Sequence, residues 1–193
     1  GTLLASYTIT VANQFAVAAA SFSPAGPTLP PSYESTSTAT TASLTRSGGA
    51  GLAATGTLNV DGGSWTLVAG SNVELSATTL TNAVGVTLTM SGDTGSFGLS
   101  LDAGSPIGVY IATLKDAGGT TRATYTVTIT TAYYVGGASF SPSAAELPLT
   151  YTRADTASTA TLTRAGNAGS NPTGTISVNA GTWEVTGGAG VTL

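Results

Sequence analysis

The sequence contains one segment twice, and this duplication constrains the fold more than any other feature. Each residue i aligns with residue i + 118, so that 1–75 pairs with 119–193 without a gap, with 34 identities in 75 pairs. A fixed offset of this kind indicates two copies of one structural unit. The 193 residues are therefore expected to be one full period of 118 residues and a remainder of 75.

The matches between the copies concentrate in blocks. Tyr7–Val11 returns as Tyr125–Ile129, and Ala20–Pro24 returns unchanged as Ala138–Pro142. The kept residues are of the types expected for cores, turns and one cation with a buried stem: Tyr7, Phe22, Pro24, Tyr33, Leu44, Arg46, Val60 and Trp65.

The unit has the pattern of an all-β fold. Tyr125, Val127 and Ile129 alternate with threonines, a period of two that places the apolar side chains on one face of a strand. Turn chemistry follows at Asp61-Gly62-Gly63 and at Asp116–Gly119. The expected strands are Ala42–Arg46, Thr55–Val60, Ser64–Val68, Val84–Met90, Phe97–Leu101, Ile107–Leu114 and Thr121–Thr130. This density of short strands predicts a Greek-key sandwich of immunoglobulin type.

The end of the unit supports a family resemblance. Ala103–Tyr110, the following Ile111–Lys115 and the threonine-rich Thr121–Thr130 resemble the last two strands of bacterial Ig-like tandem-repeat domains of surface and fibre proteins. The resemblance implies tandem Ig-like Greek-key β-sandwiches, with Tyr110 as the tyrosine that hydrogen-bonds across a sandwich corner. Ala42–Gly51 is also similar to the start of Calx-β repeats, but the chain lacks their acidic clusters, so calcium binding is not carried over.

The phase of the repeat predicts the domain boundaries. Residues 1–12 are expected to be the last strand of a preceding repeat, 13–131 a complete sandwich, and 132–193 a second, incomplete one. Asn13–Ala19 and Ala132–Gly137 are interpreted as linkers that set the angle between domains. Two explanations of the incomplete copy stay open: a fragment of a longer array, or strands supplied by neighbouring chains.

Composition excludes most catalytic chemistry. The chain has no His and no Cys, which rules out Ser-His-Asp triads, thiolate nucleophiles, zinc or copper sites with imidazole or sulfur ligands, and disulfides. None of the six carboxylates in the duplicated stretch is kept in the other copy: Glu34, Asp61, Glu74, Glu146, Asp155 and Glu184. We therefore predict no catalytic residue, no cofactor and no metal site.

Two kept pairs are the remaining candidates for a binding site. Trp65 and Trp183 match each other, and an indole either joins the core or stacks on a sugar as a glycan contact. Arg46 and Arg164 are the only cations kept in both copies. Each either covers apolar surface with its stem and binds a turn carbonyl, or contacts an anion or glycan.

The overall composition favours an extracellular role. With only five cations the chain is not expected to bind nucleic acid, and its apolar stretches are too short for a membrane span. Ser and Thr supply 58 residues, so the polar surface consists of small hydroxyls. We expect a non-enzymatic segment of an extracellular filament, stalk or adhesin at the cell surface, whose partners are neighbouring repeats or identical subunits, and a surface glycan or receptor. The alternatives are a phage or virion fibre or decoration protein at the virion surface, and a carbohydrate-binding accessory module.

Overall fold

The computed structural model describes residues 5–9, 14–49, 51–82 and 84–193. These residues form β-strands and two short 3-10 helices, and no α-helix occurs among them, which confirms the predicted all-β class. The elements are β1 (Ala16–Ser23), β2 (Thr28–Leu29), η1 (Ser35–Thr38), β3 (Thr40–Ser47), β4 (Ala54–Asp61), β5 (Ser64–Ala69), β6 (Val73–Leu75), β7 (Thr79–Thr81), β8 (Val86–Met90), β9 (Thr94–Leu101), β10 (Gly108–Asp116), β11 (Thr121–Ile129), β12 (Tyr134–Ser141), η2 (Arg153–Thr156) and β13 (Thr159–Ala165).

The chain divides into two compact units. Unit 1 comprises Gly1–Ala132 with Gly166–Gly169, and unit 2 comprises Tyr133–Ala165 with Ser170–Leu193. Each unit is described by itself below, and the predicted domain boundaries stay a prediction.

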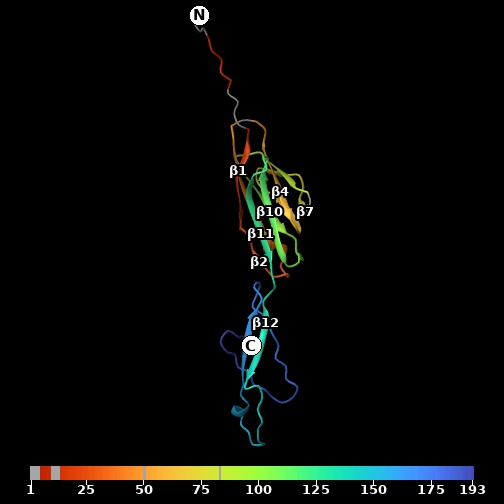
Figure 1. The fold of residues 1–193 in the computed structure, drawn as a ribbon, viewed down its shortest axis with the longest axis vertical. Helices are drawn as coiled ribbons and strands as arrows, with labels where there is room; N and C mark the ends of the chain where they lie inside the picture. Colours follow the sequence, from red (N-terminus) through yellow and green to blue (C-terminus); the bar gives the residue numbers. More distant parts are fainter. Residues whose placement is uncertain (1–4, 10–13, 50, 83) are drawn as a thin grey trace. The chain divides into compact units, whose positions relative to one another are not determined.

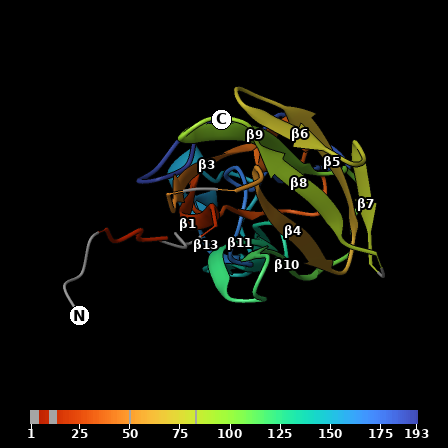
Figure 2. The ribbon, with the colours of Figure 1, turned by 90° about the horizontal axis from the view of Figure 1, so that it is seen from above.

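Unit 1 consists of two sheets around one core. One sheet has the order β1-β3-β9-β5-β7, and the other has the order β2-β11-β10-β4-β8-β6. Figure 1 shows β10 and β11 side by side, and Figure 2 shows β4 beside β8. Apolar side chains from both sheets, such as Phe97 and Leu101 on β9 and Leu58 on β4, are buried in the same cluster. The arrangement is β-sandwich-like.

β11 shows why the alternating pattern produces this core. Tyr125, Val127 and Ile129 are fully buried, whereas the threonines between them lie on the outer face. The Tyr125 ring packs 5.5 Å from the ring of Phe22 and 6.1 Å from that of Trp65. The Tyr125 hydroxyl donates a 2.6 Å hydrogen bond to the Thr38 carbonyl, so its only polar group is satisfied inside the core.

The buried phenol predicts a loss of stability at high pH. Burial raises the pKa of Tyr125 to about 12, so the unfolded chain releases this proton at a lower pH than the folded protein does. The corresponding stabilisation is complete below about pH 10 and is lost as the pH rises through about 12. We expect urea titrations of Tyr125→Phe to show a free energy of unfolding about 1 kcal/mol lower at neutral pH and a weaker decline between pH 10 and 12. Tyr134→Phe, on an exposed tyrosine, serves as the control and should keep the full decline.

The Tyr110 hydroxyl donates a 2.9 Å hydrogen bond to the Pro106 carbonyl, four residues upstream. This bond ties the loop before β10 to the strand itself.

Unit 2 contains a two-stranded sheet, β12–β13, and the 3-10 helix η2. Its strand register equals that of β1–β3 displaced by 118 residues: Val17 faces Arg46 as Val135 faces Arg164, and the irregularity that follows lies at the same place. Local hydrogen bonds also recur, since Thr40 donates to the Pro24 carbonyl and Ser158 to the Pro142 carbonyl, both at 2.6 Å.

The counterparts of β4 and β5, residues 172–179 and 182–187, form no strand in unit 2. Strand partners explain the difference. β1 and β3 pair with each other, and both lie within the duplicated stretch. β4 pairs only with β8 and β10, and β5 only with β7 and β9, none of which has a second copy in the sequence. A segment that has no neighbouring strand to form hydrogen bonds with does not form a stable strand.

Two predicted linkers are partly wrong. The predicted linker Asn13–Ala19 overlaps β1, which begins at Ala16, and Ala132–Gly137 overlaps β12, which begins at Tyr134. Alanine and glycine have low strand propensity, but the backbone ladder to β3 or β13 overrides it. Asn13 lies outside the described residues.

The N-terminal strand prediction is only partly covered by the structure. Residues 5–9 belong to no strand, and Tyr7 is 89% exposed, although its counterpart Tyr125 is buried. The rest of the predicted strand, 1–4 and 10–12, lies outside the described residues.

Candidate functional site

Trp65 on β5 lies inside the core of unit 1. Its side chain has no exposed surface, and its indole N–H donates a 2.9 Å hydrogen bond to the Gly62 carbonyl. No face of the indole is open to a sugar, so the candidate glycan contact at Trp65 is wrong. The alternation on β5, which buries Trp65 and Leu67 together, is the physical reason.

Trp183 makes the same local hydrogen bond but lies in a different environment. Its indole N–H donates to the Ala180 carbonyl at 2.8 Å, and its side chain is 64% exposed. The residue one repeat after Tyr125, which would pack against Trp183 as Tyr125 packs against Trp65, is not part of the 193-residue sequence. A glycan contact at Trp183 stays a prediction.

Each kept arginine lies over an aromatic ring. The guanidinium carbon of Arg46 lies 3.9 Å from the centre of the Phe15 ring, and that of Arg164 lies 4.1 Å from the centre of the Tyr133 ring. This is cation–π geometry. Arg46 also forms a 2.8 Å ion pair with Asp93.

Sequence reasoning identified the arginines but missed their aromatic partners. Phe15 and Tyr133 occupy equivalent positions in the two copies but are not identical, so a search for identities does not single them out. A comparison by residue class would have found an aromatic at the same position of both copies.

The carboxylates of unit 1 that form hydrogen bonds have structural partners. Asp102 accepts hydrogen bonds from Ser64 at 2.7 Å and Thr66 at 2.8 Å. Asp116 accepts from the backbone N–H of Thr120 and from the Arg122 guanidinium, both at 2.9 Å. These bonds, the Thr120 bond foremost, hold the pKa of Asp116 below its ordinary value. An acid that is kept ionised by structural partners is poorly suited to general acid catalysis.

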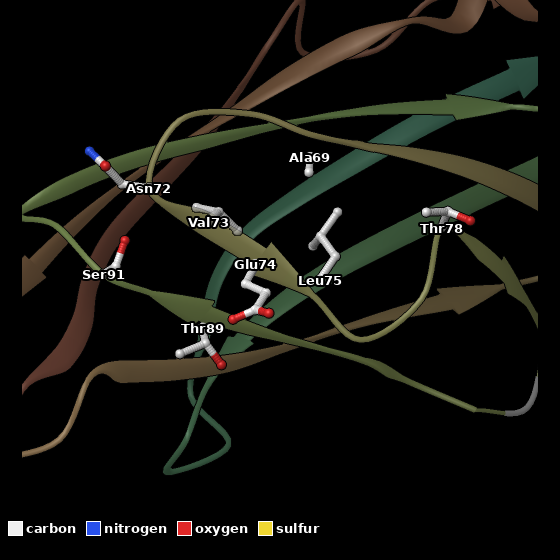
Figure 3. Close-up of a pocket in the computed structure, with 8 residues that line it drawn as sticks. All are labelled: Ala69, Asn72, Val73, Glu74, Leu75, Thr78, Thr89 and Ser91. Carbon is white, nitrogen blue, oxygen red and sulfur yellow. The ribbon is translucent and has the colours of Figure 1, made fainter.

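A shallow hollow of about 440 Å³ lies beside β6 and is shown in Figure 3. Glu74 is the one ionisable side chain among the eight that line it. A lone carboxylate provides neither the acid–base pair of a glycosidase nor the several converging oxygens of a calcium site. Across the described residues, His, Cys, Asp and Glu form no group of three or more that could hold a metal ion.

The described part of the chain includes no helix that is long and apolar enough to cross a membrane. Comparison with protein-family models, with curated proteins and with solved structures finds no match to this chain.

Proposed function

We propose that this chain is a non-enzymatic structural segment of an extracellular filament, stalk or adhesin, built from tandem Ig-like Greek-key β-sandwiches with a period of 118 residues. Its partners are neighbouring repeats or identical subunits. Its task is mechanical: each sandwich is a folded link that spaces a distal tip from the cell surface or adds to a polymer.

One observation carries this proposal. The pairing of β1 with β3 and that of β12 with β13 have the same residue register, 118 positions apart, with the irregularity at the same place. Equal backbone pairing in two segments is what a tandem array of one folded unit requires. Tandem units of this kind are a common way to build long extracellular rods, because each link folds around its own core.

The surface chemistry fits a rod outside the cell. Between Thr124 and Ile129 the outward residues of β11 are threonines, and on β3 the outward residues Thr41, Ser43 and Thr45 also carry hydroxyls. Charged residues make up only 7% of the chain. Hydration therefore rests on hydroxyl groups rather than on ion pairs, and such a surface depends little on salt or pH.

Location is the direct test of the proposed function. Antibodies raised against the purified 193-residue chain are applied to intact and to permeabilised cells that produce the protein, and the label is followed by immunogold electron microscopy. We expect label on intact cells, on thread-like structures or at the envelope surface. Label that appears only after permeabilisation would contradict the proposal, and label on purified virions would favour the virion fibre instead.

A further inference from the structure

We propose that each arginine–aromatic pair acts as a linker clamp. It holds the aromatic residue that immediately precedes the first strand of a unit against the strand that pairs with that first strand. Clamp 1 is Phe15 with Arg46, and clamp 2 is Tyr133 with Arg164. The role assigned to both arginines is positioning rather than ligand binding. This inference concerns contacts within each unit and does not depend on where the protein is located.

The position of the clamps follows from the strand register. Phe15 immediately precedes β1, and the strand residue Val17 lies directly opposite Arg46 on β3. Residues two apart lie on the same face of an extended chain, so Phe15 and Arg46 meet on the inward side of the β1–β3 pair. Tyr133, Val135 and Arg164 repeat this relation beside β12 and β13.

Clamp 1 holds its arginine in a largely enclosed place. The Arg46 side chain is 14% exposed and lies between the Phe15 ring at 3.9 Å and the Asp93 carboxylate at 2.8 Å. The backbone N–H of Arg46 also donates to the Asp93 carbonyl at 2.8 Å. An anion or glycan would have to displace Asp93 to reach this guanidinium, which disfavours a ligand-binding role.

Clamp 2 shows which part of the arrangement is repeated. The ring contact of Arg164 at 4.1 Å recurs, whereas Asp93 lies outside the duplicated stretch and has no counterpart. Arg46 and Arg164 are also the only cations kept between the copies. The common element is therefore the cation on an aromatic face, not the ion pair.

The clamp shortens an already short connection. Residues 130–133 separate the end of β11 at Ile129 from the start of β12 at Tyr134. Within this connection Tyr133 lies under Arg164, the Thr130 N–H donates to the Leu29 carbonyl at 2.9 Å, and the Thr131 carbonyl accepts from the Asn167 N–H at 3.1 Å. Because a guanidinium stays charged at all physiological pH values, the clamp is expected to hold over the whole range in which the protein is folded.

Limited proteolysis with chymotrypsin tests the proposed clamps, because this enzyme cleaves the peptide bond that follows an aromatic residue such as Phe15 or Tyr133. The full 193-residue chain is digested under native conditions, and mass spectrometry follows the cut after Phe15 and the cuts after Tyr133 and Tyr134. In Arg164→Ala we expect cleavage at Tyr133–Tyr134 to accelerate about 2- to 5-fold, the change that corresponds to loss of an exposed cation–π contact. In Arg46→Ala the same acceleration should appear at Phe15.

In each variant, cleavage at the other, unchanged clamp serves as the internal reference. Cleavage at Phe15 should be unchanged in Arg164→Ala, and cleavage at Tyr133–Tyr134 should be unchanged in Arg46→Ala, which excludes general unfolding as the cause. Arg153→Ala is the matched control in unit 2, because Arg153 pairs with Glu184 and has no ring beneath it among the described contacts. Arg164→Lys keeps a cation and should restore part of the protection. Equal acceleration in Arg164→Ala and Arg153→Ala, or none in either clamp variant, would overturn the proposal.

Discussion

Trp65→Ala is expected to lower the free energy of unfolding of unit 1 by about 3–5 kcal/mol, the usual cost of removing a fully buried Trp. Trp65 has no exposed surface, and its ring packs 6.1 Å from that of Tyr125. The substitution removes this packing and leaves a cavity that the surrounding strands cannot fill. It also leaves the Gly62 carbonyl without its 2.9 Å donor.

Trp183→Ala is the control for this experiment. Trp183 is the sequence counterpart of Trp65 but is 64% exposed, so Trp183→Ala should change the stability of unit 1 by about 0.5 kcal/mol or less. Denaturant unfolding followed by far-UV circular dichroism measures both variants without relying on Trp fluorescence. A small effect of Trp65→Ala would contradict the placement of Trp65 at the centre of the core.

The regular strands of unit 1 were predictable from sequence because their patterns are local. Ala42–Arg46, Thr55–Val60 and Ser64–Val68 lie within β3, β4 and β5, and each shows the burial alternation that its sequence indicates. The threonine-rich segment behaves in the same way in β11. In these segments side-chain pattern and tertiary position agree.

Other elements could not be predicted because distant partners determine them. β1 is rich in alanine and has little strand character of its own, yet it pairs along its length with β3. β2 has only two residues and exists because it lies parallel to the end of β11. The sequence predicted a strand from Val84, but β8 begins at Val86. Its pairing with β4 ends where Leu58 faces Val86, so the two residues before Val86 have no partner on β4.

The environment of the candidate binding residues likewise depends on distant partners and could not be predicted from the sequence. Sequence identified both tryptophans and both arginines as kept positions, but it could not tell that Trp65 is buried and Trp183 exposed. That difference arises from β9, which pairs with β5 at Trp65, and from Tyr125 on β11, whose ring packs against Trp65. The sequence contains neither a second copy of β9 nor a residue one repeat after Tyr125. The clamp depends on Phe15 and Tyr133, whose chemical class is shared although their identity is not.

We expect residues 172–187 of unit 2 to form strands when the chain is extended by a second copy of the segment that provides the strand partners of β4 and β5 in unit 1. Residues 76–131, called the closing segment, contain β7 to β11. Leu193 is the counterpart of Leu75, so a second copy of the closing segment placed directly after Leu193 continues the sequence in phase. If the 118-residue repeat is one folded unit, β8, β9 and β10 of this copy provide the missing neighbours of residues 172–187, and its Tyr125 equivalent packs against Phe140 and Trp183.

Hydrogen–deuterium exchange of residues 172–187 is the measurement that tests the repeat most directly. The account predicts that amides in this stretch exchange about 100-fold or more slowly in the extended chain than in the 193-residue chain, because they become ladder hydrogen bonds of a closed core. The matched control carries the same closing segment in scrambled order, which should leave the exchange fast. Equal, fast exchange in the extended chain and in the scrambled control would contradict the claim that 118 residues make one repeating sandwich.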